Sequence, residues 1–293
     1  MHDIKKIKSD KPGSIYVVHL IWVPYGIELF KNFITSYAKC DSGYEHELIL
    51  LFNGVNTREE TLPYLSLIDT YNISYRTLIH FGLSQDLESY FWAADQLDSE
   101  YVFFLNSYVE FLAAGWLKVF IQFVSNDVGI IGASGSWQSY HRSVFYNRTW
   151  KWERNKGVSG NVKKYKTLLK ARFWWSRFFF DFPNPHVRTN AFFIKRELFL
   201  SLDHKPLKNK FMAYVLESGK KSITNQVLKK GLKALIVDRR GNAYSSEQWA
   251  ESDIFWRNGQ ENLLIADNQT RMYETADNQY KRTLTYLAWG KNE

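Results

Sequence analysis

The fold of this chain is decided by the stretch Tyr-Val-Phe-Phe-Leu-Asn-Ser-Tyr-Val-Glu, residues 101–110. Its first five residues are all apolar or aromatic, with no alternation of polar and apolar side chains. Such a run is typical of a central strand in a parallel sheet whose two faces are both covered. The run then stops at Asn106 and Ser107. In open α/β sheets ligands bind beyond the carboxyl ends of the strands, so these two residues are predicted to lie at the ligand-binding edge.

The segments before this strand alternate between apolar runs and stretches with helical spacing. Strands are predicted over 15–23, 47–52 and 73–79, and helices over 27–38, 57–68 and 86–97. The last of these helices leads directly into the strand that begins at Tyr101. This order, with short links, predicts an α/β fold with a doubly wound, mostly parallel sheet and helices on both faces.

The chain beyond Glu110 continues with weaker signals of the same kind. Helices are predicted over 116–124, 196–200 and 222–230, and strands over 128–131, 187–194 and 234–237. We therefore expect a disordered basic leader over 1–14, one main domain over 15–240, and a C-terminal segment over 241–293.

The composition is that of a folded protein, with 45% hydrophobic and 23% charged residues. No segment approaches the roughly 18 consecutive apolar residues that span a bilayer, which argues against an integral membrane protein. The single cysteine, Cys40, excludes an internal disulfide and fits a reducing, cytoplasmic setting.

The net charge of +8 comes from one segment, which we treat as an excursion over 141–182. Between His141 and Phe180 there are eleven Lys and Arg residues and a single Glu, interleaved with Trp and Phe. This composition favours peripheral contact with an anionic membrane, where each cation contributes about 1 kcal/mol and Trp prefers the interface. An aromatic helix packed on the core, with a solvated basic face, is the alternative. No RNA-binding module is present in the sequence, so no nucleic-acid partner is expected.

The order of strands and turns resembles the nucleotide-binding half of GT-A glycosyltransferases, close to family 2, over residues 15–237. The resemblance rests on the turns Pro24-Tyr25-Gly26 and Asn53-Gly54, and on the helix from Asp86 that leads into the strand ending at Asn106. It implies an enzyme that moves a sugar from a nucleotide-sugar donor to a saccharide or lipid-linked saccharide acceptor, in surface-polysaccharide synthesis of the bacterial type. A non-catalytic relative that binds a sugar nucleotide or an anionic membrane surface is the alternative.

The resemblance also assigns residues to the nucleotide. Pro24 and Tyr25 match the loop that lies under the nucleobase, and Asn53 matches a position that touches the base edge. Asp86 matches a residue near the ribose and the base. An ordinary turn at Pro24 and Tyr25 and a helix N-cap at Asp86 are the structural alternatives. With Asn106 and Ser107, these residues form the predicted nucleotide-sugar site.

The largest departure from the family lies at its metal site. Asn106 and Tyr108 match the two aspartates of the Asp-x-Asp motif, and neither is a carboxylate. Mg²⁺ and Mn²⁺ prefer anionic oxygen ligands, so we predict no required metal and at most a weak dependence on Mg²⁺ or Mn²⁺. Three explanations stay open: basic residues neutralise the diphosphate, Glu110 or Asp267 serves as a ligand, or the protein is not catalytic.

The family's catalytic base is matched by Glu217, because Glu217-Ser218-Gly219 precedes the helix predicted over 222–230. An inverting, single-displacement transfer needs one carboxylate within hydrogen-bond reach of the incoming hydroxyl. Glu217 is therefore the predicted base, with a structural role at the N-terminus of that helix as the alternative. The family's second acid is replaced by Ser218.

The remaining assignments concern the acceptor and the diphosphate. Trp137, His186 and Arg188 are predicted on the acceptor side. Arg188 is also a candidate for binding the diphosphate or an acidic sugar, with an ion pair at the surface as the structural alternative. Arg271 is the second candidate, because C-terminal segments of GT-A enzymes fold back over the donor. We expect a cytoplasmic protein that contacts the inner face of the membrane.

Overall fold

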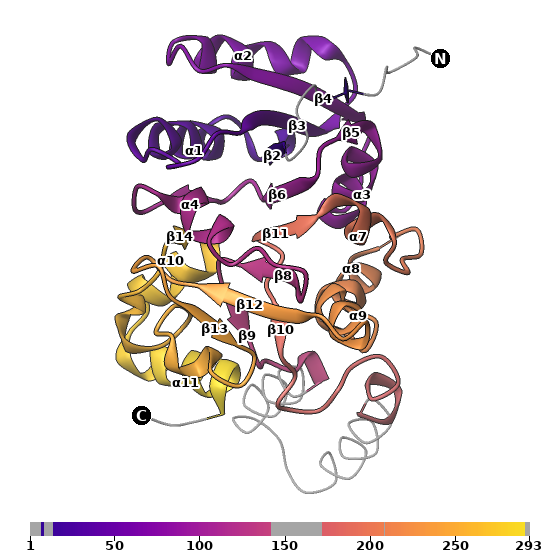
Figure 1. The fold of residues 1–293 in the computed structure, drawn as a ribbon, viewed down its shortest axis with the longest axis vertical. Helices are drawn as coiled ribbons and strands as arrows, with labels where there is room; N and C mark the ends of the chain where they lie inside the picture. The colour runs from indigo at the N-terminus through magenta and orange to yellow at the C-terminus, as the bar shows by residue number, and fades with distance from the viewer. Residues whose placement is uncertain (1–6, 9–13, 142–171, 208, 291–293) are drawn as a thin grey trace, which may run out of the picture.

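A computed structural model describes residues 7–8, 14–141, 172–207 and 209–290 of the chain (Figure 1). Within these residues eight strands form one sheet in the order β13-β12-β8-β11-β6-β2-β3-β4. The strands are β2 (Ile15–Trp22), β3 (Glu47–Val55), β4 (Tyr75–Phe81), β6 (Tyr101–Leu105), β8 (Val128–Gly132), β11 (Ala191–Lys195), β12 (Lys233–Val237) and β13 (Ala243–Ser245). All are parallel to one another except β11 and β13.

Strand β6 lies in the middle of this sheet, between β2 on one side and β11 on the other. Val102, Phe103, Phe104 and Leu105 are completely buried, which explains why the strand carries no polar side chain before Asn106. The predicted α/β class and the doubly wound, mostly parallel sheet are confirmed.

Helices cover both faces of the sheet, as predicted. Odd-numbered residues of β2, such as Val17, pack with Phe33 of α1, whereas even-numbered residues, such as Val18, pack with Tyr90 of α3. The first face is covered by α1 (Glu28–Lys39), α2 (Leu62–Asp69) and α4 (Trp116–Ile121). The second is covered by α3 (Asp86–Gln96), α7 (Arg196–Leu200), α8 (Lys210–Ser218) and α9 (Ile223–Lys229).

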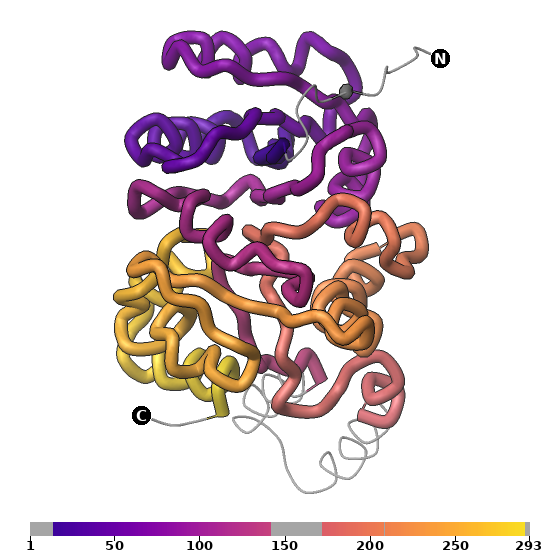
Figure 2. Tube along the Cα trace, viewed as in Figure 1, coloured from indigo at the N-terminus to yellow at the C-terminus, as the bar shows by residue number. Residues whose placement is uncertain are grey.

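The C-terminal segment packs beside the β12 and β13 end of the sheet (Figures 1 and 2). Its strand β14 (Ile265–Ala266) pairs with β7 (Glu110–Phe111), which follows β6 in the chain. Two helices follow, α10 (Asn268–Thr275) and α11 (Asn278–Trp289). They begin after Asp267 and Asp277, whose side chains accept hydrogen bonds from the first free backbone amides.

The described residues also contain shorter elements. They are the strands β1 (Ile7–Lys8), β5 (Leu97–Asp98), β9 (Gly135–Ser136) and β10 (His186–Val187), and the 3-10 helices η1 (Val23–Tyr25), η2 (Arg58–Thr61), η3 (Trp249–Glu251) and η4 (Asn258–Gln260). Strands β1 and β5 pair, so two residues of the stretch predicted to be a disordered leader take part in strand pairing. Most of the basic excursion, residues 142–171, lies outside the described part of the chain. No helix in the described ranges is long and apolar enough to cross a membrane.

Two sequence predictions need correction. The single strand predicted over 187–194 is two strands, because the chain leaves β10 at Val187 and enters β11 only at Ala191. The helix α8 was not predicted, and Glu217 lies in its last turn rather than at the start of α9. The base predicted at Glu217 therefore has a different local setting from the one expected.

Candidate functional site

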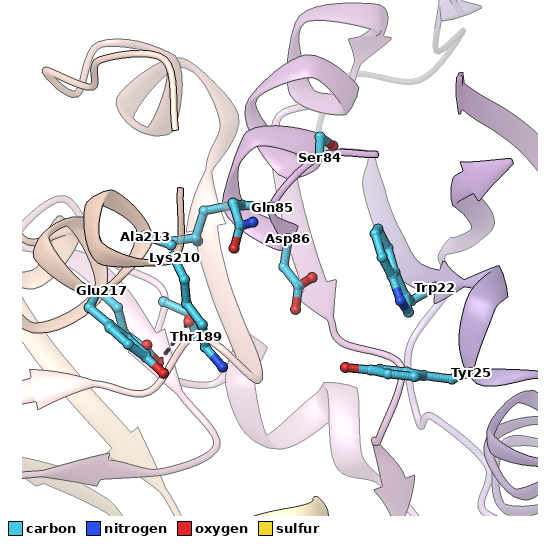
Figure 3. A pocket seen from close by; sticks show the side chains of 11 residues that line it. Trp22, Tyr25, Ser84, Gln85, Asp86, Thr189, Lys210, Ala213 and Glu217 are labelled. Carbon is cyan, nitrogen blue, oxygen red and sulfur yellow. Dashed lines mark hydrogen bonds between the residues drawn. The ribbon is translucent and has the colours of Figure 1, made fainter. Parts of the chain in front are cut away.

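A pocket of about 360 Å³ opens at the carboxyl edge of the parallel strands (Figure 3). Its walls come from the end of β2 with the turn that follows it, the loop between β4 and α3, Thr189 just before β11, and helix α8. The lining residues are Trp22, Tyr25, Ser84, Gln85, Asp86, Leu87, Thr189, Lys210, Ala213, Tyr214 and Glu217. Strand β2 has β3 on one side and β6 on the other, so the strand order reverses there. Such a switch point is where open α/β sheets bind ligands.

One wall of the pocket is aromatic. The Tyr25 ring is 54% exposed and lies 6.3 Å from the ring of Trp22 and 5.3 Å from that of Tyr108. The turn that presents Tyr25 is fixed by Pro24, which packs against Gly54. A Cβ at Gly54 would come within 2.6 Å of the Pro24 ring, and the positive φ of Gly54 also favours glycine. Pro24 therefore shapes the loop without lining the pocket.

Asp86 faces the pocket from the first residue of α3 (Figure 3). It is open to the pocket, yet protein surrounds it on most sides, and its pKa is raised to about 6. Burial is the larger cause, and repulsion by Glu217 is the second. The N-cap of α3 is Gln85, so Asp86 is not used as the cap.

Glu217 lies on the opposite wall, where its Oε1 accepts a 3.0 Å hydrogen bond from the Thr189 hydroxyl (Figure 3). Glu217 lies in the last turn of α8, and the N-cap of α9 is Ser222. The alternative that Glu217 stabilises a helix N-terminus is therefore wrong. Thr189 holds the carboxylate in the pocket.

Lys210, the first residue of α8, brings a positive charge to the pocket. Its ammonium lies 5.6 Å from the centre of the Tyr214 ring, and the hydrogen bond with Tyr214 is the main cause of its raised pKa. Lys210 was not among the residues predicted from the sequence. The helix that carries Lys210 could have been predicted, because Asn209 caps it and Met212 and Leu216 follow at helical spacing, but no local pattern marks Lys210 itself.

Asn53 and Ser107 lie next to the pocket, but their side chains are used within the protein. The buried Asn53 amide donates to the Ser84 carbonyl and the Ser89 hydroxyl, so it fixes the loop that lines one wall. The Ser107 hydroxyl donates to the Leu20 carbonyl at 2.8 Å and accepts from the Trp22 amide at 3.0 Å. It thereby ties the end of β6 to the end of β2.

The residues that match the metal-binding motif, Asn106 and Tyr108, form a hydrogen-bonded turn. The side-chain oxygen of Asn106 accepts a hydrogen bond from the backbone amide of Tyr108. The backbone amide of Asn106 donates to the backbone carbonyl of Asn190. The two other proposed ligands are already paired: Glu110 with Arg271 at 2.8 Å, and the fully buried Asp267 with Arg188. In the described ranges no group of three His, Cys, Asp or Glu residues could hold a metal ion. The residues at this edge do not fit a divalent cation.

The two predicted diphosphate ligands, Arg188 and Arg271, join the C-terminal segment to the sheet. Arg188 lies 2.6 Å from Asp267, and its guanidinium stacks 4.1 Å from the centre of the Phe255 ring. Arg271 donates to Glu110 and to the Tyr108 carbonyl. Neither arginine lines the pocket.

The predicted acceptor residues Trp137 and His186 do not line this pocket either. The Trp137 indole donates to the Ser246 carbonyl at 2.8 Å, so it packs against the C-terminal segment. His186 is buried, its Nδ1 lies 2.9 Å from the Asn184 carbonyl oxygen, and burial lowers its pKa. Of the predicted site residues, the structure brings Tyr25, Asp86 and Glu217 together around one cavity.

The chain is similar to known proteins in structure but not detectably in sequence. No family model matches the chain, and no curated protein matches it. Among solved structures, the bifunctional glycosyltransferase WbbM is 13% identical over 96% of this chain and 45% of its own, with a TM-score of 0.47. The mannosyltransferase PcManGT from Pyrobaculum calidifontis is 10% identical over 97% of this chain and 72% of its own, with a TM-score of 0.45.

Staphylococcus aureus TarS is 16% identical over 41% of this chain, with a TM-score of 0.32, and the match spans 34% of the TarS chain. At these identities and TM-scores the similarities do not indicate the activity of this chain.

Proposed function

We propose that this chain is a GT-A-like glycosyltransferase that moves a sugar from a nucleotide-sugar donor to a saccharide acceptor. The observation that carries the proposal is the pocket at the switch point of the sheet. There the Glu217 carboxylate, held by Thr189, lies across from the aromatic wall of Trp22 and Tyr25. An aromatic wall suits a nucleobase, and a fixed carboxylate suits proton transfer from a sugar hydroxyl.

Four side chains of the pocket have a part in this proposal. The exposed Tyr25 ring stacks on the base, which contributes about 1–3 kcal/mol per base in other nucleic-acid sites. Asp86 accepts a hydrogen bond from the ribose or the base when it is ionised. Glu217 takes the proton of the acceptor hydroxyl as that oxygen attacks the anomeric carbon. Thr189 occupies only Oε1 of Glu217, which leaves Oε2 for the acceptor.

The biological setting is also a proposal. The basic, aromatic composition of the excursion supports a lipid-linked saccharide acceptor and contact with the inner, anionic face of a membrane. An acceptor of this kind suits the assembly of a surface polysaccharide.

A non-catalytic sugar-nucleotide-binding protein is the second candidate, and one observation favours it. The family's second acid is replaced by Ser218, whose hydroxyl bonds back to the Tyr214 carbonyl within α8. Only one carboxylate, Glu217, then remains on this wall for catalysis. The glycosyltransferase and the non-catalytic binding protein would bind the same nucleotide, but only the glycosyltransferase would transfer the sugar.

A panel of nucleoside diphosphates and their sugars, screened by thermal shift with Mn²⁺ and with EDTA, tests the nucleotide site. We expect at least one of them to raise the Tm by a few degrees, since a ligand at about 100 times its Kd stabilises by roughly 2.7 kcal/mol. We expect the shift to persist in EDTA. A Tyr25→Ala variant, which removes an exposed ring, should show a smaller shift, because the loss of about 1–3 kcal/mol of stacking weakens binding. No shift with any compound would contradict the proposal.

A further inference from the structure

The charges inside the pocket do not suit a diphosphate unless a cation is added. Asp86 and Glu217 both line the pocket, and each raises the electrostatic potential energy of an anion placed between them. Their mutual repulsion is strong enough to contribute to the raised pKa of Asp86. A ligand that carries two phosphates therefore needs a positive charge within the same cavity.

Among the described residues, Lys210 is the only Lys or Arg that lines this pocket. None of the ion pairs between described residues includes Lys210. Arg188 and Arg271 are instead held by Asp267 and Glu110. The ammonium of Lys210 interacts with the neutral Tyr214 side chain but has no carboxylate partner within ion-pair distance, so its charge is available to a ligand. The two guanidinium groups are already paired.

The direction of the Lys210 side chain also fits an anion. Its amine points into the pocket from α8, while the Tyr25 hydroxyl points in from the other side (Figure 3). Tyr25 in turn packs on Tyr108, the residue at the second position of the missing metal motif. Lys210 therefore faces the wall formed by Tyr25, against which Tyr108 packs.

We propose that Lys210 binds the diphosphate of the nucleotide ligand and supplies the positive charge that a divalent cation supplies in metal-dependent relatives. The inference rests on the proposed function. During transfer the acceptor oxygen bonds to the anomeric carbon, and the bond from that carbon to the β-phosphate oxygen breaks. The electron pair stays on the phosphate, where Lys210 stabilises it, and the acceptor proton passes to Glu217.

The test is calorimetry in EDTA with the nucleotide that stabilises the unsubstituted protein, together with its monophosphate and its nucleoside. Lys210→Gln should weaken diphosphate binding about 10-fold or more, because hydrogen bonds to charged groups contribute about 1.5–3 kcal/mol. It should weaken the monophosphate less and leave the nucleoside unchanged. Lys210→Arg should retain most of the affinity. Lys205→Gln removes the same charge outside the pocket and should have no effect.

The possible failures are distinct. If Lys210→Gln binds the diphosphate as tightly as the unsubstituted protein does, or loses nucleoside affinity equally, the role of Lys210 is wrong while the nucleotide site stands. If no nucleotide binds the unsubstituted protein, the proposed function and the role of Lys210 both fail. Because Lys210 is exposed at the helix start, the variant's Tm without ligand should match that of the Lys205 control.

Discussion

Two groups of charged side chains lie near the carboxyl edge of the sheet, and they are arranged in opposite ways. At the C-terminal junction, Arg188 is paired with Asp267 and Arg271 with Glu110. In the pocket, Asp86 and Lys210 take part in no ion pair between described residues. Paired, buried charges hold one part of the chain against another, whereas unpaired charges around a cavity are available to a ligand. This difference distinguishes charged residues with a structural role from those that can bind a ligand, which the sequence alone does not do.

The largest expected effect on stability comes from breaking the junction. Asp267→Asn keeps an oxygen that can cap α10 and removes the charge that faces Arg188. Because Asp267 is fully buried and Arg188 is 12% exposed, the guanidinium is left unpaired, and we expect a loss of about 3 kcal/mol or more in the free energy of unfolding. Urea denaturation followed by Trp fluorescence measures it.

Glu110→Gln is the matched control for that variant, since Glu110 and Arg271 are 28% and 32% exposed. Its expected loss is about 1 kcal/mol or less. Equal losses from the two variants would show that burial does not distinguish the two pairs. Neither variant should change nucleotide affinity.

A smaller effect is expected from the pH dependence of Asp86. Its folded-state pKa of about 6 lies above the ordinary 3.8, so the folded protein binds the proton more tightly than the unfolded chain does. The stability from this group is present below about pH 4 and is lost as the pH rises through about 6. We expect the Tm of Asp86→Asn, relative to the unsubstituted protein, to increase between pH 4 and pH 7. A Tm difference that does not vary with pH would contradict the raised pKa.

The fold could be predicted from the sequence where burial leaves a clear pattern. Strands covered on both faces, such as 47–52 and 101–105, are unbroken apolar runs. The direction of β11 could not be predicted, because a buried strand has the same apolar sequence in either orientation. Helix α8 was missed although its cap at Asn209 and its apolar face were visible.

The site could be predicted only in part, because the partner of a charged residue depends on tertiary structure. Asp86 and Glu217 were found through a resemblance, but their common cavity follows from the tertiary position of α8, which packs against α9 and β10. The chemistry of the Arg188 guanidinium suits a diphosphate, and no local sequence pattern shows that Asp267 pairs with it. Lys210 had no motif to distinguish it from the other lysines.

The most direct test of the account is the turnover of Glu217→Gln. The measurement is release of nucleoside diphosphate from the nucleotide sugar that stabilises the protein, in the presence of a saccharide acceptor, with Kd determined in parallel. We predict that Glu217→Gln lowers the rate about 100-fold or more and leaves nucleotide affinity nearly unchanged, while Glu251→Gln, outside the pocket, has no effect. Turnover by Glu217→Gln equal to that of the unsubstituted protein would contradict the assignment of the base.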